Sequence, residues 1–131
     1  MIYLLDTNTV SQWLSPVGQE TQNKINELIT QNHRIALCQP VIYELVRGLL
    51  WKQAPRKLSI LREKILPQLE KVDLLETDWL QAAQFWAETR RKGRQLSDAD
   101  LLLAAIAYRL GAVLVSHDTD FDALPVILEA W

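Results

Sequence analysis

Residues 96–116, LSDADLLLAAIAYRLGAVLVS, contain a helix start, an apolar helix, a helix stop and a buried strand in direct succession. Ser97 followed by Asp100 is typical of a helix N-terminus, and Gly111 is a common stop, so we expect a helix over about 98–110. The following run AVLVS, 112–116, is nearly all apolar, as in a parallel strand buried on both faces. A helix that leads directly into such a strand indicates an α/β protein.

Similar signals occur along the rest of the chain. Besides 112–116, strands are predicted at 2–5 (IYLL), 34–38 (RIALC), 72–75 (VDLL) and within PVILEA, 125–130. Helices are predicted between them, at about 9–14, 19–30, 39–52, 56–71 and 78–92. Pro67 would kink or end the helix at 56–71, Asp78 would cap the next helix, and Gly93 would stop it. This alternation predicts a three-layer α/β/α sandwich with a mainly parallel central sheet.

Length and composition limit the possible classes of protein. The 131 residues, 49% apolar and 23% charged, fit one globular domain spanning 1–131. No apolar run approaches the roughly 20 residues of a membrane span, and no signal peptide is apparent. Cys38 is the only cysteine, which excludes an internal disulfide and favours a cytoplasmic location. The net charge of −2 excludes a generally basic protein that coats nucleic acid, so binding a polyanion would need a local basic surface or bound cations.

Carboxylates stand beside the apolar elements. Asp6 follows the first strand and Asp118 follows the strand at 112–116, so both would face one crevice if these strands are neighbours. Asp98 and Asp100 begin the apolar helix that leads into that second strand. Each acid also has a simpler interpretation, because Asp6 can cap the helix after it and Asp100 can cap its own.

Glu44 lies on a helix that is apolar on most of its surface. Ile42, Leu45 and Leu49 form one stripe, and the side of Glu44 carries further apolar residues. An ionised glutamate in such surroundings needs a partner, unless its side chain reaches solvent. Carboxylates that converge on one crevice repel each other unless a cation lies between them, and oxygen ligands select Mg²⁺ or Mn²⁺ over zinc. The residues therefore predict a metal-dependent phosphoryl-transfer or hydrolysis site.

Three motifs in this order and spacing resemble the PIN domain, and more narrowly the VapC-type toxins of toxin–antitoxin pairs. They are LLDTNTV near the start, PVIYELVRG in a helix, and SDADLLLAAIAYRLGAVLVSHDTDF, and the resemblance covers essentially the whole chain. It implies a Mg²⁺- or Mn²⁺-dependent endoribonuclease that cleaves RNA. It also implies inhibition by a cognate antitoxin, which typically inserts a segment near the active site, and a homodimer.

The resemblance also implies roles for individual residues. Catalysis and metal binding would fall to four acids, Asp6, Glu44, Asp100 and Asp118. Asn8 would support the site without binding the metal, and Ser116 stands where the family usually has threonine. Asp98 could share the role of Asp100, and Asp120 and Asp122 crowd Asp118, so these positions remain open.

A basic rim is needed around such an acidic centre if it binds RNA. One basic stretch precedes the Asp100 helix and consists of Arg90, Arg91, Lys92 and Arg94, which we predict to bind substrate. A second follows Glu44 and consists of Arg47, Lys52, Arg56 and Lys57. The alternative is that both are ordinary solvated helix ends, which the helix dipole favours.

Two other functions remain possible. DTNTV is one residue away from the D-x-D motif of haloacid-dehalogenase-type phosphatases, but Asn8 replaces the second aspartate. That fold also needs a lysine late in the chain, and the last lysine here is Lys92. The other alternative is an inactive PIN-like scaffold, which the intact acids disfavour.

Overall fold

The centre of the molecule is a five-stranded, wholly parallel sheet in a computed structural model that describes residues 1–131. The strand order is β3–β2–β1–β4–β5. The strands are β1 (Ile2–Leu5), β2 (Arg34–Cys38), β3 (Glu70–Val72), β4 (Val113–Val115) and β5 (Ile127–Glu129). Because β1 pairs with both β2 and β4, it is the central strand and its carboxyl end lies at the middle of the sheet edge.

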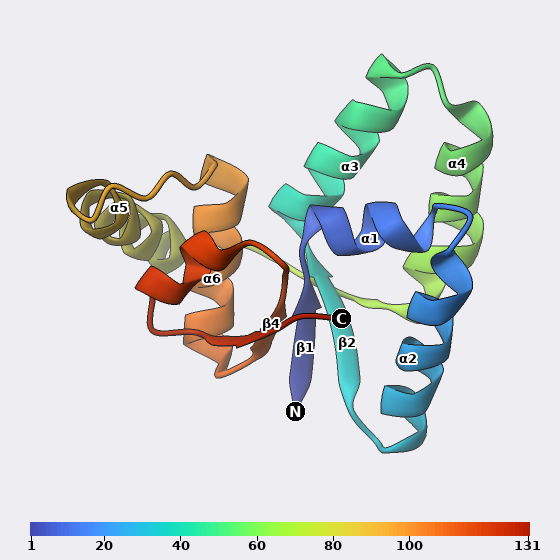
Figure 1. Ribbon diagram of the computed structural model, residues 1–131, viewed down its shortest axis with the longest axis horizontal. Helices are drawn as coiled ribbons and strands as arrows, with labels where there is room; N and C mark the ends of the chain where they lie inside the picture. The colour runs from blue at the N-terminus through green and yellow to red at the C-terminus, as the bar shows by residue number, and fades with distance from the viewer.

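Six α-helices cover the sheet in two groups, with α1 to α4 on one side and α5 and α6 on the other (Figure 1). They are α1 (Thr7–Trp13), α2 (Gly18–Thr30), α3 (Gln39–Trp51), α4 (Pro55–Ile60), α5 (Glu76–Arg91) and α6 (Asp98–Leu110). This arrangement confirms the predicted α/β/α sandwich. None of the helices is both long and apolar enough to span a membrane.

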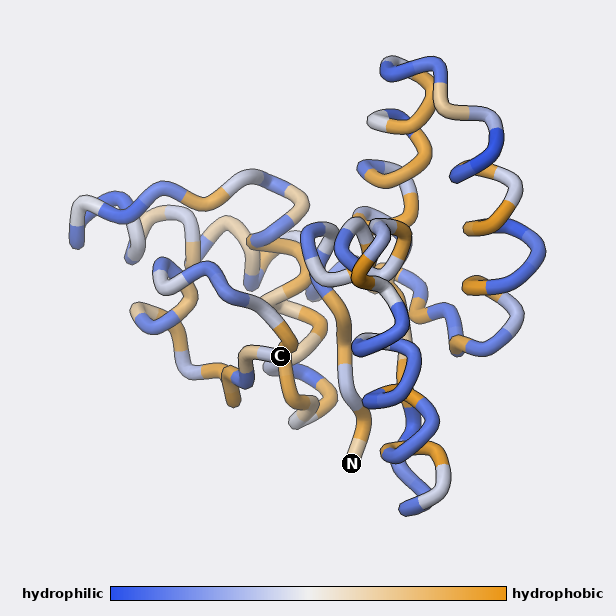
Figure 2. Tube along the Cα trace, turned by 45° about the vertical axis from the view of Figure 1, so that its right-hand side comes forward, coloured by the Kyte–Doolittle hydropathy of each residue, from blue (hydrophilic) through white to orange (hydrophobic).

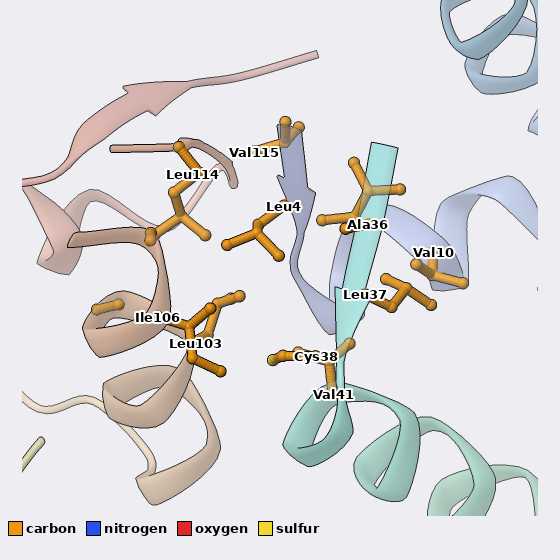
Figure 3. Close-up of a cluster of buried hydrophobic side chains, with 14 of the residues drawn as sticks. Leu4, Val10, Ala36, Leu37, Cys38, Val41, Leu103, Ile106, Leu114 and Val115 are labelled. Carbon is orange, nitrogen blue, oxygen red and sulfur yellow. The ribbon is translucent and has the colours of Figure 1, made fainter. Parts of the chain in front are cut away.

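The core forms where the alternate faces of the strands meet the helices. Leu4 and Leu114 point toward Leu103 and Ile106 of α6, whereas Leu37 points toward α1 on the opposite face (Figure 3). The residues 101–107 of α6 are all buried, which explains why the pattern of this helix is apolar on every side. Gly111 ends α6 with a φ of 61°, the left-handed conformation that glycine adopts without strain.

The segment 55–72 differs from the predicted helix at 56–71. Helix α4 ends at Ile60, a π-helical turn and a 3₁₀ turn follow, and the helical segment stops at Gln68. Strand β3 then begins at Glu70, two residues before the predicted strand at 72–75, because residues 70–72 pair with β2. The prediction of the boundary was wrong, since the apolar spacing of the helix continues through Leu69 although the helix has ended.

The start of α5 also differs from the prediction. Leu75, not Asp78, occupies the N-cap, and α5 begins at Glu76. Asp78 instead lies in the first turn, where its Oδ2 accepts a hydrogen bond of 2.8 Å from the backbone N–H of Leu75. The carboxylate therefore still satisfies a free donor at the helix start, from a position inside the helix.

Candidate active site

Asp6 lies at the carboxyl end of β1 and caps α1 at the same time. Its Oδ1 accepts hydrogen bonds from the backbone N–H and the hydroxyl of Thr9, at 2.8 and 2.6 Å. Its backbone N–H donates to the carbonyl of Val115 in β4, which extends the sheet to this residue. Both interpretations of Asp6 are therefore compatible, because capping uses only Oδ1 and leaves Oδ2 for another ligand.

Glu44 projects from α3 beside the start of α1. The hydroxyl of Thr7 donates to Glu44 Oε1 at 2.5 Å, and the guanidinium of Arg47 lies 3.9 Å from Glu44 Oε2. Glu44 is half-buried and lines two pockets, of about 610 and 670 Å³. A carboxylate fixed between two pockets can reach a ligand bound in either.

Asp100 lies in the first turn of α6, where Ser97 is the N-cap and accepts a hydrogen bond from the Asp100 N–H. Burial, together with the negative charges of Glu44 and Asp118, raises the pKa of Asp100 to about 6, although hydrogen bonding by Ser97 opposes the shift. Glu44 of α3 and Asp118 of the segment after β4 are therefore near enough to Asp100 for their charges to disfavour its ionised form. Such mutual repulsion is what a bound cation would relieve.

Asp118 is held by the turn that follows β4. The buried hydroxyl of Ser116 accepts a hydrogen bond from the Asp118 N–H, and Asp118 Oδ1 accepts one from the Asp120 N–H. Asp120 in turn lies 3.4 Å from the Arg94 guanidinium. Asp120 therefore has a cationic partner within the protein, whereas Asp118 has none.

The other predicted positions differ in exposure. Asn8, Asp98 and Asp122 are exposed, while Asp100 and Asp118 are half-buried. No three acidic, histidine or cysteine side chains converge closely enough to hold one ion. The donors nevertheless fit a hard divalent cation, because they are carboxylate oxygens and their like charges destabilise the arrangement without one.

Cys38 takes no part in this chemistry. It is buried at the end of β2, and burial raises the pKa of its thiol to about 11. The thiol therefore stays protonated at neutral pH and is a poor nucleophile.

The two basic stretches have different surroundings. Lys92 donates to the carbonyl of Ala123, Arg94 donates to that of Thr119, and Arg90 stacks on Trp86. The second stretch, in contrast, contributes Lys52, Arg56 and Lys57 to the pocket of about 670 Å³ beside Glu44.

The hydroxyls of Thr7 and Thr9 are features of the site that the sequence analysis did not single out. Thr9 fixes Asp6 and Thr7 fixes Glu44, so one short helix start orients two acids from different elements. The polar run directly after the buried strand was the only sequence feature that could have pointed to these two hydroxyls. It does not predict that Thr7 contacts Glu44, which lies 37 residues away along the chain.

Replacing Thr7 with Val is expected to weaken the apparent affinity of the site for Mn²⁺ by about 10- to 100-fold, the usual effect of losing a partner that orients a metal ligand. Thr7→Ser is the matched control, because it keeps the hydroxyl, and it should retain the wild-type affinity. Equal Mn²⁺ affinities for the Val and Ser variants in a binding titration would show that the contact with Glu44 is incidental.

The sequence is similar to those of known proteins over nearly its whole length. The family model for the PIN domain matches residues 3–127. VapC ribonuclease Mb1587 of Mycobacterium bovis is 32% identical over 123 residues, covering 92% of this chain and 90% of that protein. The tRNA(fMet)-specific endonuclease VapC of Salmonella typhimurium is 25% identical over 131 residues, covering 98% and 97% of the two chains.

A solved structure shares the fold over its full length. It is the VapBC2 complex of Rickettsia felis bound to a DNA fragment from its promoter. One chain superposes with a TM-score of 0.84 at 29% identity, and the match covers 100% of this chain and 99% of the other.

Proposed function

Because the chain belongs to the PIN domain family, we propose that it is a VapC-type toxin, an endoribonuclease that hydrolyses RNA at a Mg²⁺ or Mn²⁺ site and is inhibited by an antitoxin. The similarity to VapC ribonucleases along nearly the whole chain supports this proposal. The observation that carries the chemistry is the pair of acids held by the start of α1, Asp6 through Thr9 and Glu44 through Thr7. Asp100 joins them in the proposal, because its raised pKa reflects burial and the nearby charge of Glu44. The proposal includes a cytoplasmic location, where an RNA substrate would be met.

The acids have distinct parts in this proposal. Asp6 offers Oδ2 to the metal because Thr9 occupies Oδ1, and Glu44 offers Oε2 because Thr7 occupies Oε1. Asp100 in the first turn of α6 and Asp118 in the turn after β4 complete the proposed set, with Asn8, Ser116, Asp98 and Asp120 as supporting positions. A divalent cation, when bound, polarises the phosphodiester and lowers the pKa of an attacking water.

A homodimer forms part of the proposal. Figure 2 shows α3 as largely hydrophobic, and its side chains Tyr43, Leu50 and Trp51 are exposed. Trp79 and Trp86 of α5 are exposed as well. Apolar surface of this extent is typical of an interface. Light scattering of the purified protein tests it, and a monomeric mass at micromolar concentration would contradict it.

The ribonuclease proposal is tested by incubating the purified, antitoxin-free protein with total RNA in Mg²⁺, in Mn²⁺ and in EDTA. We expect discrete fragments with either metal and none in EDTA, because the acids alone cannot polarise a phosphate. Restoring Mg²⁺ after EDTA should restore cleavage. Glu27→Gln, which alters an exposed acid on α2, is a control that should behave as wild type.

Absence of cleavage with every metal, in a protein shown to be folded, would overturn the proposal. Hydrolysis of a phosphate monoester under the same conditions would then favour the haloacid-dehalogenase-type phosphatase. Inactivity toward both substrates would favour the inactive scaffold.

A further inference from the structure

A groove of about 670 Å³ lies beside Glu44 and carries concentrated positive charge. It is lined on one side by Thr7 and Asn8 of α1 and on the other by residues around the α3–α4 connection. Lys52, Arg56 and Lys57 come from this second side, and all three are exposed. We call this the basic groove.

The three basic side chains of the groove have no acidic partner within the protein. The ion pairs of the molecule join Arg34 to Glu70, Arg47 to Glu44, Arg94 to Asp120 and Arg109 to Asp78. What distinguishes Lys52, Arg56 and Lys57 is that they line one groove together, in a chain whose net charge is −2. Their charge is free to attract an anion.

The polar residues of the groove connect this charge to the acidic site. Glu44 lines the groove, and Thr7, which donates to Glu44, lines it too. A phosphodiester chain that lies along Lys52, Arg56 and Lys57 would therefore continue directly to the acids. Single strands are commonly bound in this way, by a basic groove that follows the backbone.

From these observations we propose that the basic groove binds the RNA backbone next to the scissile phosphate, an inference that rests on the proposed ribonuclease function. We assign the binding of the RNA backbone to the basic groove in preference to the stretch 90–94. Lys92 and Arg94 already donate to carbonyls of the segment 119–123, and Arg94 also pairs with Asp120.

The test measures how RNA binding depends on salt. Fluorescence anisotropy of a labelled 20-nucleotide oligo(U) in EDTA reports binding without cleavage. The variant Lys52→Ala/Arg56→Ala/Lys57→Ala removes three phosphate contacts, so the slope of log affinity against log salt should become shallower by about 2. Between about 50 and 200 mM salt, the wild type should then lose roughly 20-fold more affinity than the variant.

Two further variants control for net charge and for side-chain identity. Arg62→Ala/Lys64→Ala/Lys71→Ala removes the same charge from exposed positions outside the groove and should keep the wild-type slope. The variant Lys52→Arg/Arg56→Lys/Lys57→Arg keeps the charge and should also keep the wild-type slope. Thermal melts of all the variants verify folding.

The outcomes separate this inference from the ribonuclease proposal. An unchanged slope in the groove variant, or an equal change in the Arg62 control, overturns the groove as an RNA site, even if metal-dependent cleavage is observed. A shallower slope confined to the groove variant supports it, even if no cleavage is found.

Discussion

Replacing Asp100 with Asn is expected to reduce RNA cleavage by at least about 100-fold, while leaving the metal-free protein folded and more stable than the wild type. The proposed ligand set predicts this loss, because the amide would remove a negatively charged oxygen from it, and even partners outside a ligand set cost about 10- to 100-fold. Asp6→Asn should lose activity to the same degree. The measurements are the initial rate of cleavage with Mg²⁺ and the melting temperature in EDTA.

The stability of the Asp100 variant should change in the opposite direction to its activity. The pKa of Asp100 is raised to about 6 in the folded protein, by burial and by Glu44 and Asp118, so its ionised form destabilises the fold at pH 7. Asparagine removes this charge. Because Asp100 is only half-buried, solvent screening limits the gain, and we expect about 1 kcal/mol.

The difference in stability between the wild type and the Asn variant should depend on pH. Between about pH 4 and pH 6 the folded state binds more protons at Asp100 than the unfolded state, so the metal-free wild type gains stability as the pH falls through this range. The advantage of the Asn variant should therefore be greatest above pH 6 and should vanish near pH 4. An advantage that stays constant with pH would contradict the electrostatic explanation.

Asp98→Asn is the matched control for Asp100→Asn. Asp98 lies two positions before Asp100, in the same helical turn, but it is exposed. It should keep its cleavage rate within about threefold, since it is exposed and is proposed as a supporting position, not as a ligand. A loss as large as that of Asp100→Asn would mean that Asp98 shares the ligand role.

The sequence identified the central strands because their signals are local. Residues 34–38 are a strand at the predicted bounds, and 98–110 are the predicted helix, since caps, stops and apolar runs are short-range features. Strand β3 was misplaced because it is an edge strand with only three residues, and Glu70 and Lys71 within it are exposed. Its position is set by pairing with β2, which no local pattern encodes.

The acids of the site were identifiable for the same reason, but the contacts around them were not. Asp6 and Asp118 follow apolar runs that can be read directly from the chain. The resemblance already favoured Asp100 over Asp98, and the structure adds that Asp100 is half-buried whereas Asp98 is exposed. The pairing of Asp120 with Arg94 joins residues 26 positions apart, so it required the structure.

Replacing Asp78 with Ala is expected to destabilise the protein by about 3 kcal/mol, because it breaks a buried ion pair and leaves one partner uncompensated. Asp78 is almost fully buried and accepts hydrogen bonds from Arg109 Nε and Nη2, at 2.9 and 3.0 Å, and from the Leu75 N–H. These contacts join the start of α5 to the end of α6. Since α6 carries Asp100 at its other end, the pair also helps to fix the helix that bears the acid.

The matched control is Glu70→Ala, which breaks the pair between Arg34 and Glu70 at the same distance of 2.9 Å. Both of its side chains are largely exposed, so the loss should stay below about 1 kcal/mol. Urea unfolding of the two variants and the wild type measures the difference. Equal losses would show that burial does not strengthen the Asp78 pair. A large loss for Asp78→Ala alone would identify the α5–α6 junction as the stabilising contact that sequence analysis interpreted only as a helix cap.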